Sequence, residues 1–113
     1  MNEKDEGNKV SALVTAWFEG ETTMFDAVTD EPEIAWRAIL EISNRNLTDE
    51  EKALLAAGAL ESLLVGHGAA FIDRIEAQAR TNSRFSHLLG GVWRQDMPDQ
   101  IWERIERVRG SRW

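Results

Sequence analysis

Residues 47–93 read LTDEEKALLAAGALESLLVGHGAAFIDRIEAQARTNSRFSHLLGGVW, and this stretch decides the fold. Leucine and alanine dominate its first half, and short apolar runs alternate with glycines at Gly58, Gly66, Gly68, Gly90 and Gly91. Glycine is the residue that most often follows the last turn of a helix, because it tolerates backbone conformations that other residues avoid. The stretch therefore predicts short helices folded back on one another as hairpins.

Local signals place the helices within the stretch. Thr48 and Glu51 have the spacing of a capping box, in which each side chain accepts a hydrogen bond from the other residue's backbone amide. The apolar spacing after them is helical up to Gly58, where the sequence leaves open whether the helix breaks or bends. A short helix should end at Gly66 and Gly68, and a strongly amphipathic helix should follow over residues 69–80.

Helices are also expected on both sides of the stretch. Residues 10–18 have helical apolar spacing and end at Gly20, whereas residues 21–28 remain ambiguous. Pro32 and Pro98 each suit the first turn of a further helix. The segments that begin at these two prolines resemble each other, either because they form a duplicated unit or because two helix starts share the same chemistry. No alternating pattern of a β-strand occurs.

The fold class predicted is all-α: a single domain of about six or seven short helices packed as successive hairpins, similar to helical-repeat architecture. A length of 113 residues suits one domain. We expect a disordered segment over residues 1–9 and the helical domain over residues 10–113. The chain has no cysteine and a polar start, and we see no apolar run of about 20 residues, so we expect a cytoplasmic protein without a membrane segment.

Charge is distributed unevenly along the chain. Residues 1–50 hold 12 Asp and Glu against 4 Lys and Arg, whereas residues 51–113 hold 8 against 9. An acidic surface repels nucleic acid and steers a basic partner towards it, although acidity can also serve solubility alone. The expected contact charges are Glu19, Glu21, Asp26, Asp30, Glu31 and Glu33.

Four polar residues are the candidates for chemistry: Glu61, His67, Asp73 and Glu76. A metal site or small active site would require them to converge in one cleft. The alternative is structural, because a glutamate can bind the free amides at a helix start and a histidine between two glycines can bind the last carbonyls of a helix. The spacing matches no metal-ligand motif, so we expect no metal and no cofactor.

Two tryptophans are candidates for surface contacts. Trp93 follows a pair of glycines, and Trp113 stands beside Arg112, where it could anchor a partner or fold back over the last helix. A homo-oligomer closed by the region around Trp102 and Trp113 is a further possibility, as is contact between the basic C-terminal segment and the acidic half of a second copy.

The stretch Ala57-Gly58-Ala59-Leu60-Glu61-Ser62-Leu63-Leu64-Val65-Gly66-His67-Gly68 resembles an uncharacterised family of small bacterial proteins. The resemblance covers residues 34–105, and Ala59 stands where that family has proline. It implies an all-helical domain and supplies no catalytic residues. Stacked helices present broad surfaces, and the sequence shows no assembled reaction chemistry, so we expect a non-enzymatic protein-interaction module. The acidic N-terminal half suits an immunity or inhibitor protein that binds a basic partner. The alternatives are a small enzyme or metal-binding protein using Glu61 and His67, or a structural homo-oligomer.

Overall fold

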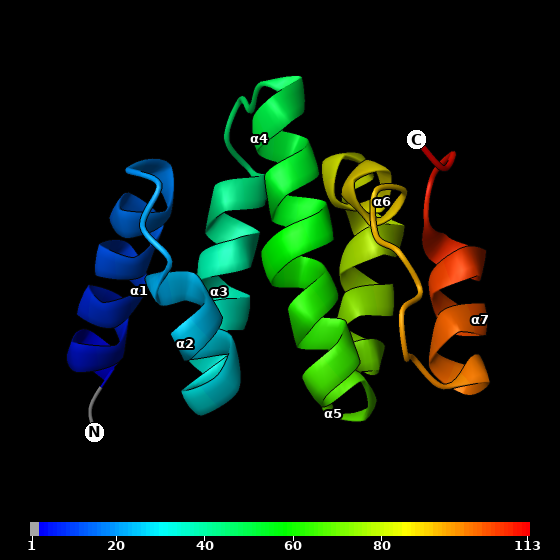
Figure 1. Cartoon of the computed structure of the whole chain (residues 1–113), viewed down its shortest axis with the longest axis horizontal. Coiled ribbons are helices and arrows are strands. Elements are labelled where there is room, and N and C mark those ends of the chain that lie inside the picture. Colours follow the sequence, from blue (N-terminus) through cyan, green and yellow to red (C-terminus); the bar gives the residue numbers. More distant parts are fainter. Residues whose placement is uncertain (1–2) are drawn as a thin grey trace.

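The computed structural model describes residues 3–113, which form seven α-helices and one π-helical segment (Figure 1). The bounds are α1 (Glu3–Phe18), α2 (Thr23–Asp30), α3 (Pro32–Ser43), α4 (Asp49–Leu54), η1 (Leu55–Leu60, the π segment), α5 (Glu61–Thr81), α6 (Ser83–Leu89) and α7 (Asp99–Val108). No strand occurs within this described range. The prediction of an all-α domain of six or seven short helices is confirmed.

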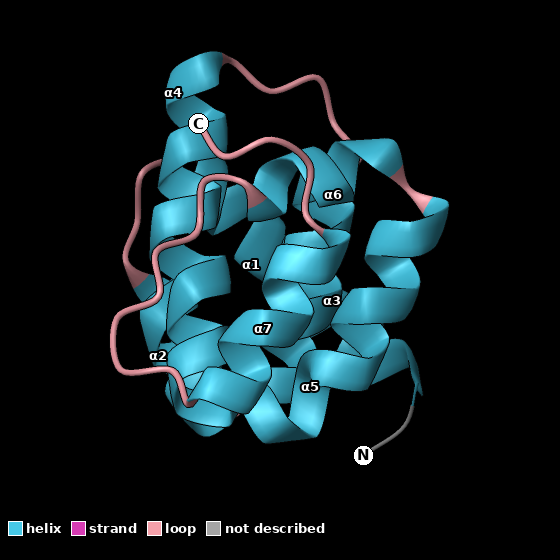
Figure 2. Cartoon of the chain, turned by 90° about the vertical axis from the view of Figure 1, so that its right-hand side faces the viewer, coloured by secondary structure: helices cyan, strands magenta, loops and turns pink. Residues whose placement is uncertain are grey.

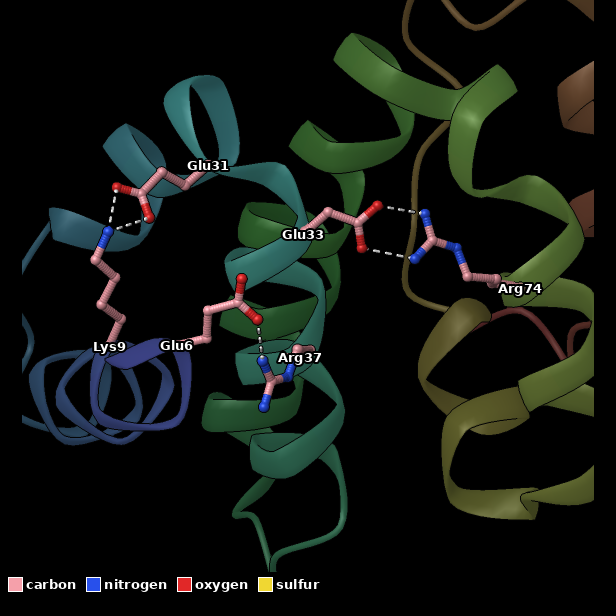
Figure 3. A network of polar contacts seen from close by, with 6 residues as sticks. All are labelled: Glu6, Lys9, Glu31, Glu33, Arg37 and Arg74. Carbon is pink, nitrogen blue, oxygen red and sulfur yellow. Dashed lines mark hydrogen bonds and ion pairs between the residues drawn. The ribbon is translucent and has the colours of Figure 1, made fainter. Parts of the chain in front are cut away.

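The start of α1 differs from the prediction that residues 1–9 are disordered, because the helix begins at Glu3. Lys9 Nζ lies 3.2 Å from Glu31 Oε2, and Arg37 Nη1 lies 3.3 Å from Glu6 Oε2 (Figure 3). These ion pairs join the first half of α1 to residues more than 20 positions away, which local composition does not reveal. Residues 1 and 2, which the same prediction included, lie outside the described range.

A continuous helical backbone runs through α4, η1 and α5, and Gly58 lies inside its π segment. The helix therefore neither breaks nor simply bends at Gly58; it widens for about one turn, as a π segment does. A Cβ atom at Gly58 would lie 3.5 Å from the ring of Phe25. The Phe25 ring, which α2 contributes, thus packs directly against the widened turn.

The chain reverses direction at His67, whose φ of −137° and ψ of 23° are not helical. The two legs on either side of this residue lie antiparallel, with the turn at the lower end of the view in Figure 1. The predicted end of a helix between Gly66 and Gly68 is confirmed. Gly68 also lets α7 approach, because a Cβ there would lie 3.3 Å from Cγ2 of Ile101.

The core is centred on three aromatic side chains from α3, α5 and α6. The ring of Trp36 lies 6.0 Å from that of Phe71 and 5.7 Å, edge to face, from that of Phe85. The capping box is present as predicted: the Thr48 hydroxyl accepts from the amide of Glu51 at 3.1 Å, and the Glu51 carboxylate accepts from the amide of Thr48 at 2.9 Å. On the side shown in Figure 2, α7 packs against α5.

One helix, Asp49–Thr81, is long and apolar enough to cross a membrane when only length and composition are considered. This helix differs from the expectation of no membrane-length apolar segment, because Gly58, Gly66 and Gly68 divide it into short runs in the sequence. The turn at His67 splits it into two antiparallel legs, and half of its most apolar window is buried inside the domain. These features are those of a folded hairpin in a helical core.

Candidate interaction surfaces

A groove of about 490 Å³ lies between α1 and α2. Gly20, with a φ of 82°, ends α1 in the left-handed conformation that residues with a Cβ atom rarely adopt. This turn reverses the chain, so that α2 packs beside α1. Leu13, Ala16 and Ile34 are among the apolar residues that line the groove. An apolar groove beside charged side chains is a suitable surface for a segment of another protein.

The sides of this groove are acidic. Glu21, Asp26 and Asp30 line it with exposed side chains, and none of these three carboxylates has a hydrogen bond or ion pair with another residue of the described range. Glu31 also lines the groove, but it is paired with Lys9 (Figure 3). Lys9 also lines the groove but is paired with Glu31, so three negative charges border the groove without an ion pair in the described part of the chain.

The other two predicted contact charges lie elsewhere. Glu33 accepts two hydrogen bonds from Arg74, at 2.7 and 2.8 Å, which join α3 to α5 (Figure 3). These bonds lower the pKa of Glu33 below its ordinary value, against the smaller opposing effect of desolvation. Glu19 lines a separate hollow together with Glu41 and Arg45. Of the six acids predicted from the sequence, four share the groove and three of those four are unpaired.

Glu61 is hydrogen-bonded to the backbone of a loop that is distant in the sequence. Its Oε1 accepts a hydrogen bond of 2.7 Å from the amide of Trp93, in the loop between α6 and α7. The alternative weighed from the sequence was similar, since it gave this carboxylate a free backbone amide as its partner. His67 lies six residues further along, at the turn of the hairpin, with its side chain half-buried.

Asp73 and Glu76 both accept hydrogen bonds from Arg104 of α7, at 2.6 Å in the case of Asp73. The hydrogen bond from Arg104 lowers the pKa of Glu76, although burial of this side chain opposes the shift. The same two bonds raise the pKa of Arg104. Asp73 and Glu76 therefore join α5 to α7, while Glu61 binds a different segment.

The four candidates for chemistry do not form one site. Within residues 3–113, no group of three or more histidine, cysteine, aspartate or glutamate side chains is arranged to hold a metal ion. The sign that would have favoured the enzyme or metal-site alternative was convergence of Glu61, His67, Asp73 and Glu76. The geometry instead gives three of these side chains contacts that connect separate helices and loops.

The two surface tryptophans have different environments. Trp113 packs on its own chain: its Nε1–H donates to the carbonyl of His87 at 2.6 Å, and its ring stacks on the His87 ring at 5.3 Å. Trp93 is 54% exposed, and the guanidinium of Arg112 lies 4.4 Å from the centre of its ring. Trp93 is thus the more accessible of the two for a partner.

Sequence reasoning missed a second cavity, of about 470 Å³, where the α3–α4 loop meets α6. Arg45, Lys52 and Arg84 line it, and so does His87. These residues are up to 42 positions apart in the sequence. No spacing motif could have revealed them, because the packing of α6 beside the loop brings them together.

Comparison with known proteins gives one match. No curated protein and no solved structure matches the chain significantly. A family model described as "Family of unknown function (DUF6869)" matches residues 4–113, a range that includes the stretch with the family resemblance noted above. Because this match extends over nearly the whole chain, the protein belongs to the family of unknown function DUF6869.

Proposed function

We propose that this protein is an interaction module that binds a basic segment of a partner protein in the groove between α1 and α2. The observation that carries the proposal is the combination of an apolar lining with three unpaired carboxylates, those of Glu21, Asp26 and Asp30. Apolar contact supplies affinity, and complementary charge supplies orientation and a faster encounter.

The excess of acidic residues in the N-terminal half supports the same reading. The balance of −8 over residues 1–50 gives this half a negative field that attracts cations from a distance. The carboxylates of Glu31 and Glu33 already hold helices together through Lys9 and Arg74, so they contribute less to a partner. Glu19 lies outside the groove. The charges proposed to contact the partner are therefore those of the three unpaired groove residues, Glu21, Asp26 and Asp30.

The chemistry of the partner follows from the groove. An apolar side chain of the partner fits between α1 and α2, and lysine or arginine residues on either side of it meet the carboxylates. A partner with a strongly basic surface, such as a nuclease, would give the protein an immunity or inhibitor role. Such a role requires only binding and no reaction chemistry in this chain.

The test is a pair of matched charge reversals. The first variant is E21K/D26K/D30K, and the control is E19K/D96K/E103K, in which three other exposed acids are reversed. The two variants have the same net charge, so a general electrostatic effect changes both equally. Tagged wild-type protein and both variants are used to capture partners from the native host at low and moderate salt, and the captured proteins are identified by mass spectrometry.

The expected result is a basic protein captured by the wild type and by the control but lost with the groove variant. Purified partner should then shift the backbone NMR signals of α1 and α2. The proposal is refuted if both variants lose the partner equally, because attraction would then not depend on the groove. Capture of only a second copy of this chain would support the homo-oligomer alternative instead.

A further inference from the structure

The cavity between the α3–α4 loop and α6 carries an excess of positive charge that folding does not neutralise. Arg45, Lys52 and Arg84 line this cavity, and none of its described lining residues is acidic. The whole chain has a net charge of −7. Three cations gathered around one cavity repel one another, and an anion that enters the cavity removes this repulsion.

Arg84 is held in place by neutral partners. Its Nη1 donates to the carbonyl of Asn44 at 2.8 Å, and its Nη2 donates to Oδ1 of Asn46 at 3.2 Å. Neither partner carries a charge, so these bonds fix the guanidinium without balancing it. A positioned guanidinium with remaining N–H groups is well suited to a carboxylate or phosphate group, because less side-chain freedom is lost on binding.

Of the other two cations, Lys52 is free among the described residues and Arg45 is partly engaged, because its guanidinium lies 5.6 Å from the centre of the Phe18 ring. The ammonium of Lys52 has no hydrogen bond or ion pair with another residue in the described part of the chain. Arg45 lies 3.9 Å from the carboxylate of Glu41, the longest ion pair among the described residues. His87 adds an imidazole to the same cavity. Of the three cations in the lining, only Arg45 therefore has an ion pair among the described residues.

We propose that this cavity binds a small organic phosphate. Arg84, Lys52 and Arg45 would hold the phosphate oxygens, and Leu47 and Leu88, which also line the cavity, would contact the carbon part of the ligand. A volume of about 470 Å³ lies within the range of small-molecule sites. The site shares no residue with the α1–α2 groove, so it stands independently of the proposed interaction with a basic partner.

A small ligand fits this site better than a nucleic acid does. Asp49 and Glu50 are exposed at the start of α4, directly after the α3–α4 loop that forms one wall of the cavity. An extended polyanion that reached the cavity would also meet these carboxylates and the negative field of the whole chain. A single phosphate group avoids most of that repulsion.

The experiment is a titration of the full chain, labelled with ¹⁵N, with phenyl phosphate as the probe. Phenol is the control ligand that lacks the phosphate group, and inorganic phosphate is the control ligand that lacks the phenyl ring. We expect phenyl phosphate to shift the amide signals of residues 45–52 and 83–88, and to bind more tightly than inorganic phosphate. Phenol should leave these signals unchanged.

Lys52→Gln is the decisive variant, because it removes one positive charge and no hydrogen bond within the described chain. It should weaken the binding of phenyl phosphate by about two- to fivefold, the upper part of the range that one solvent-accessible ion pair supplies. Arg107→Gln is the control, since Arg107 is exposed and lies outside the cavity. Arg84→Gln should weaken binding further, but it also removes the contacts of Arg84 with Asn44 and Asn46.

Three results would overturn the proposal. The first is an absence of signal changes around the cavity at millimolar phenyl phosphate. The second is an equal loss of affinity in Lys52→Gln and Arg107→Gln, which would indicate general attraction of anions. The third is tighter binding of a single-stranded RNA oligonucleotide than of phenyl phosphate to the same residues, which would replace the small ligand with a nucleic acid.

Discussion

Substitution of Gly91 by alanine should displace Trp113 from the position in which it packs. A Cβ atom at Gly91 would lie 2.7 Å from two atoms of the Trp113 ring and 3.0 Å from the Cβ of Ala56. The first distance is far below ordinary van der Waals contact, so the ring must move. Ala56 is buried in the π segment and has little room to yield. The backbone of Gly91 does not have a positive φ, so the cost is steric.

The size of the effect follows from the contacts that Trp113 would lose. The hydrogen bond from its Nε1–H to the carbonyl of His87 contributes about 1 kcal/mol. Its stacking on the His87 ring contributes about 1 kcal/mol more. The contact with Ala56 adds up to about 1 kcal/mol. We therefore expect G91A to lower the free energy of unfolding by about 2 to 3 kcal/mol.

A double-mutant cycle separates these contributions. In a W113A background the ring is absent, so G91A should lower the free energy of unfolding only through its contact with Ala56. The coupling free energy between positions 91 and 113 should therefore be about 2 kcal/mol. Urea unfolding followed by far-ultraviolet circular dichroism measures each free energy. Gly7→Ala in the first half of α1 is the control for the substitution itself: a Cβ there meets nothing within 4 Å, so this change should not lower the free energy of unfolding. An equal cost of G91A with and without Trp113 would refute the packing described for the ring.

Two further predictions concern contacts of α5. Because the pKa of Glu76 is lowered in the folded state, its pairing with Arg104 stabilises the fold above the ordinary glutamate pKa of 4.5, and this stability is lost as the pH falls through the folded-state pKa. Glu76→Gln should therefore reduce the dependence of unfolding free energy on pH in the acid range; an unchanged acid profile in urea titrations would contradict this. Glu61→Ala should speed hydrogen exchange at the amide of Trp93 and cost about 1 kcal/mol, whereas Glu61→Gln keeps an acceptor and should behave almost as the wild type. Equal exchange rates in both variants would show that the 2.7 Å contact does not protect this amide.

The parts of the fold that the sequence predicted correctly depend on neighbours in the chain. The capping box of Thr48 and Glu51 satisfies backbone amides within one helical turn, so its two residues alone specify it. The reversal is likewise marked locally by Gly66 and Gly68, although the residue that departs from helical geometry is His67 between them. Amphipathic spacing identified the helical segments for the same reason.

The parts that were missed depend on distant residues. The first turns of α1 are held by the Lys9–Glu31 and Glu6–Arg37 pairs, and no local pattern distinguishes them from a polar tail. The π segment around Gly58 packs against Phe25, whose contact arises only when α2 folds onto the hairpin. Such features are properties of the packed chain, so no short pattern in the sequence encodes them.

The distribution of charge shows why the candidate surfaces needed the structure. The sequence gives a strongly acidic first half and an almost neutral second half, but ion pairs between helices use part of each. Glu33 is bound by Arg74, and Arg104 is bound by Asp73 and Glu76. Among the charges without an ion pair in the described part of the chain, three acids border the α1–α2 groove, and Lys52 and Arg84 line the cavity beside α6. Unpaired charges around a groove or cavity contribute little to the stability of the fold, so these two places are the ones for which binding is proposed.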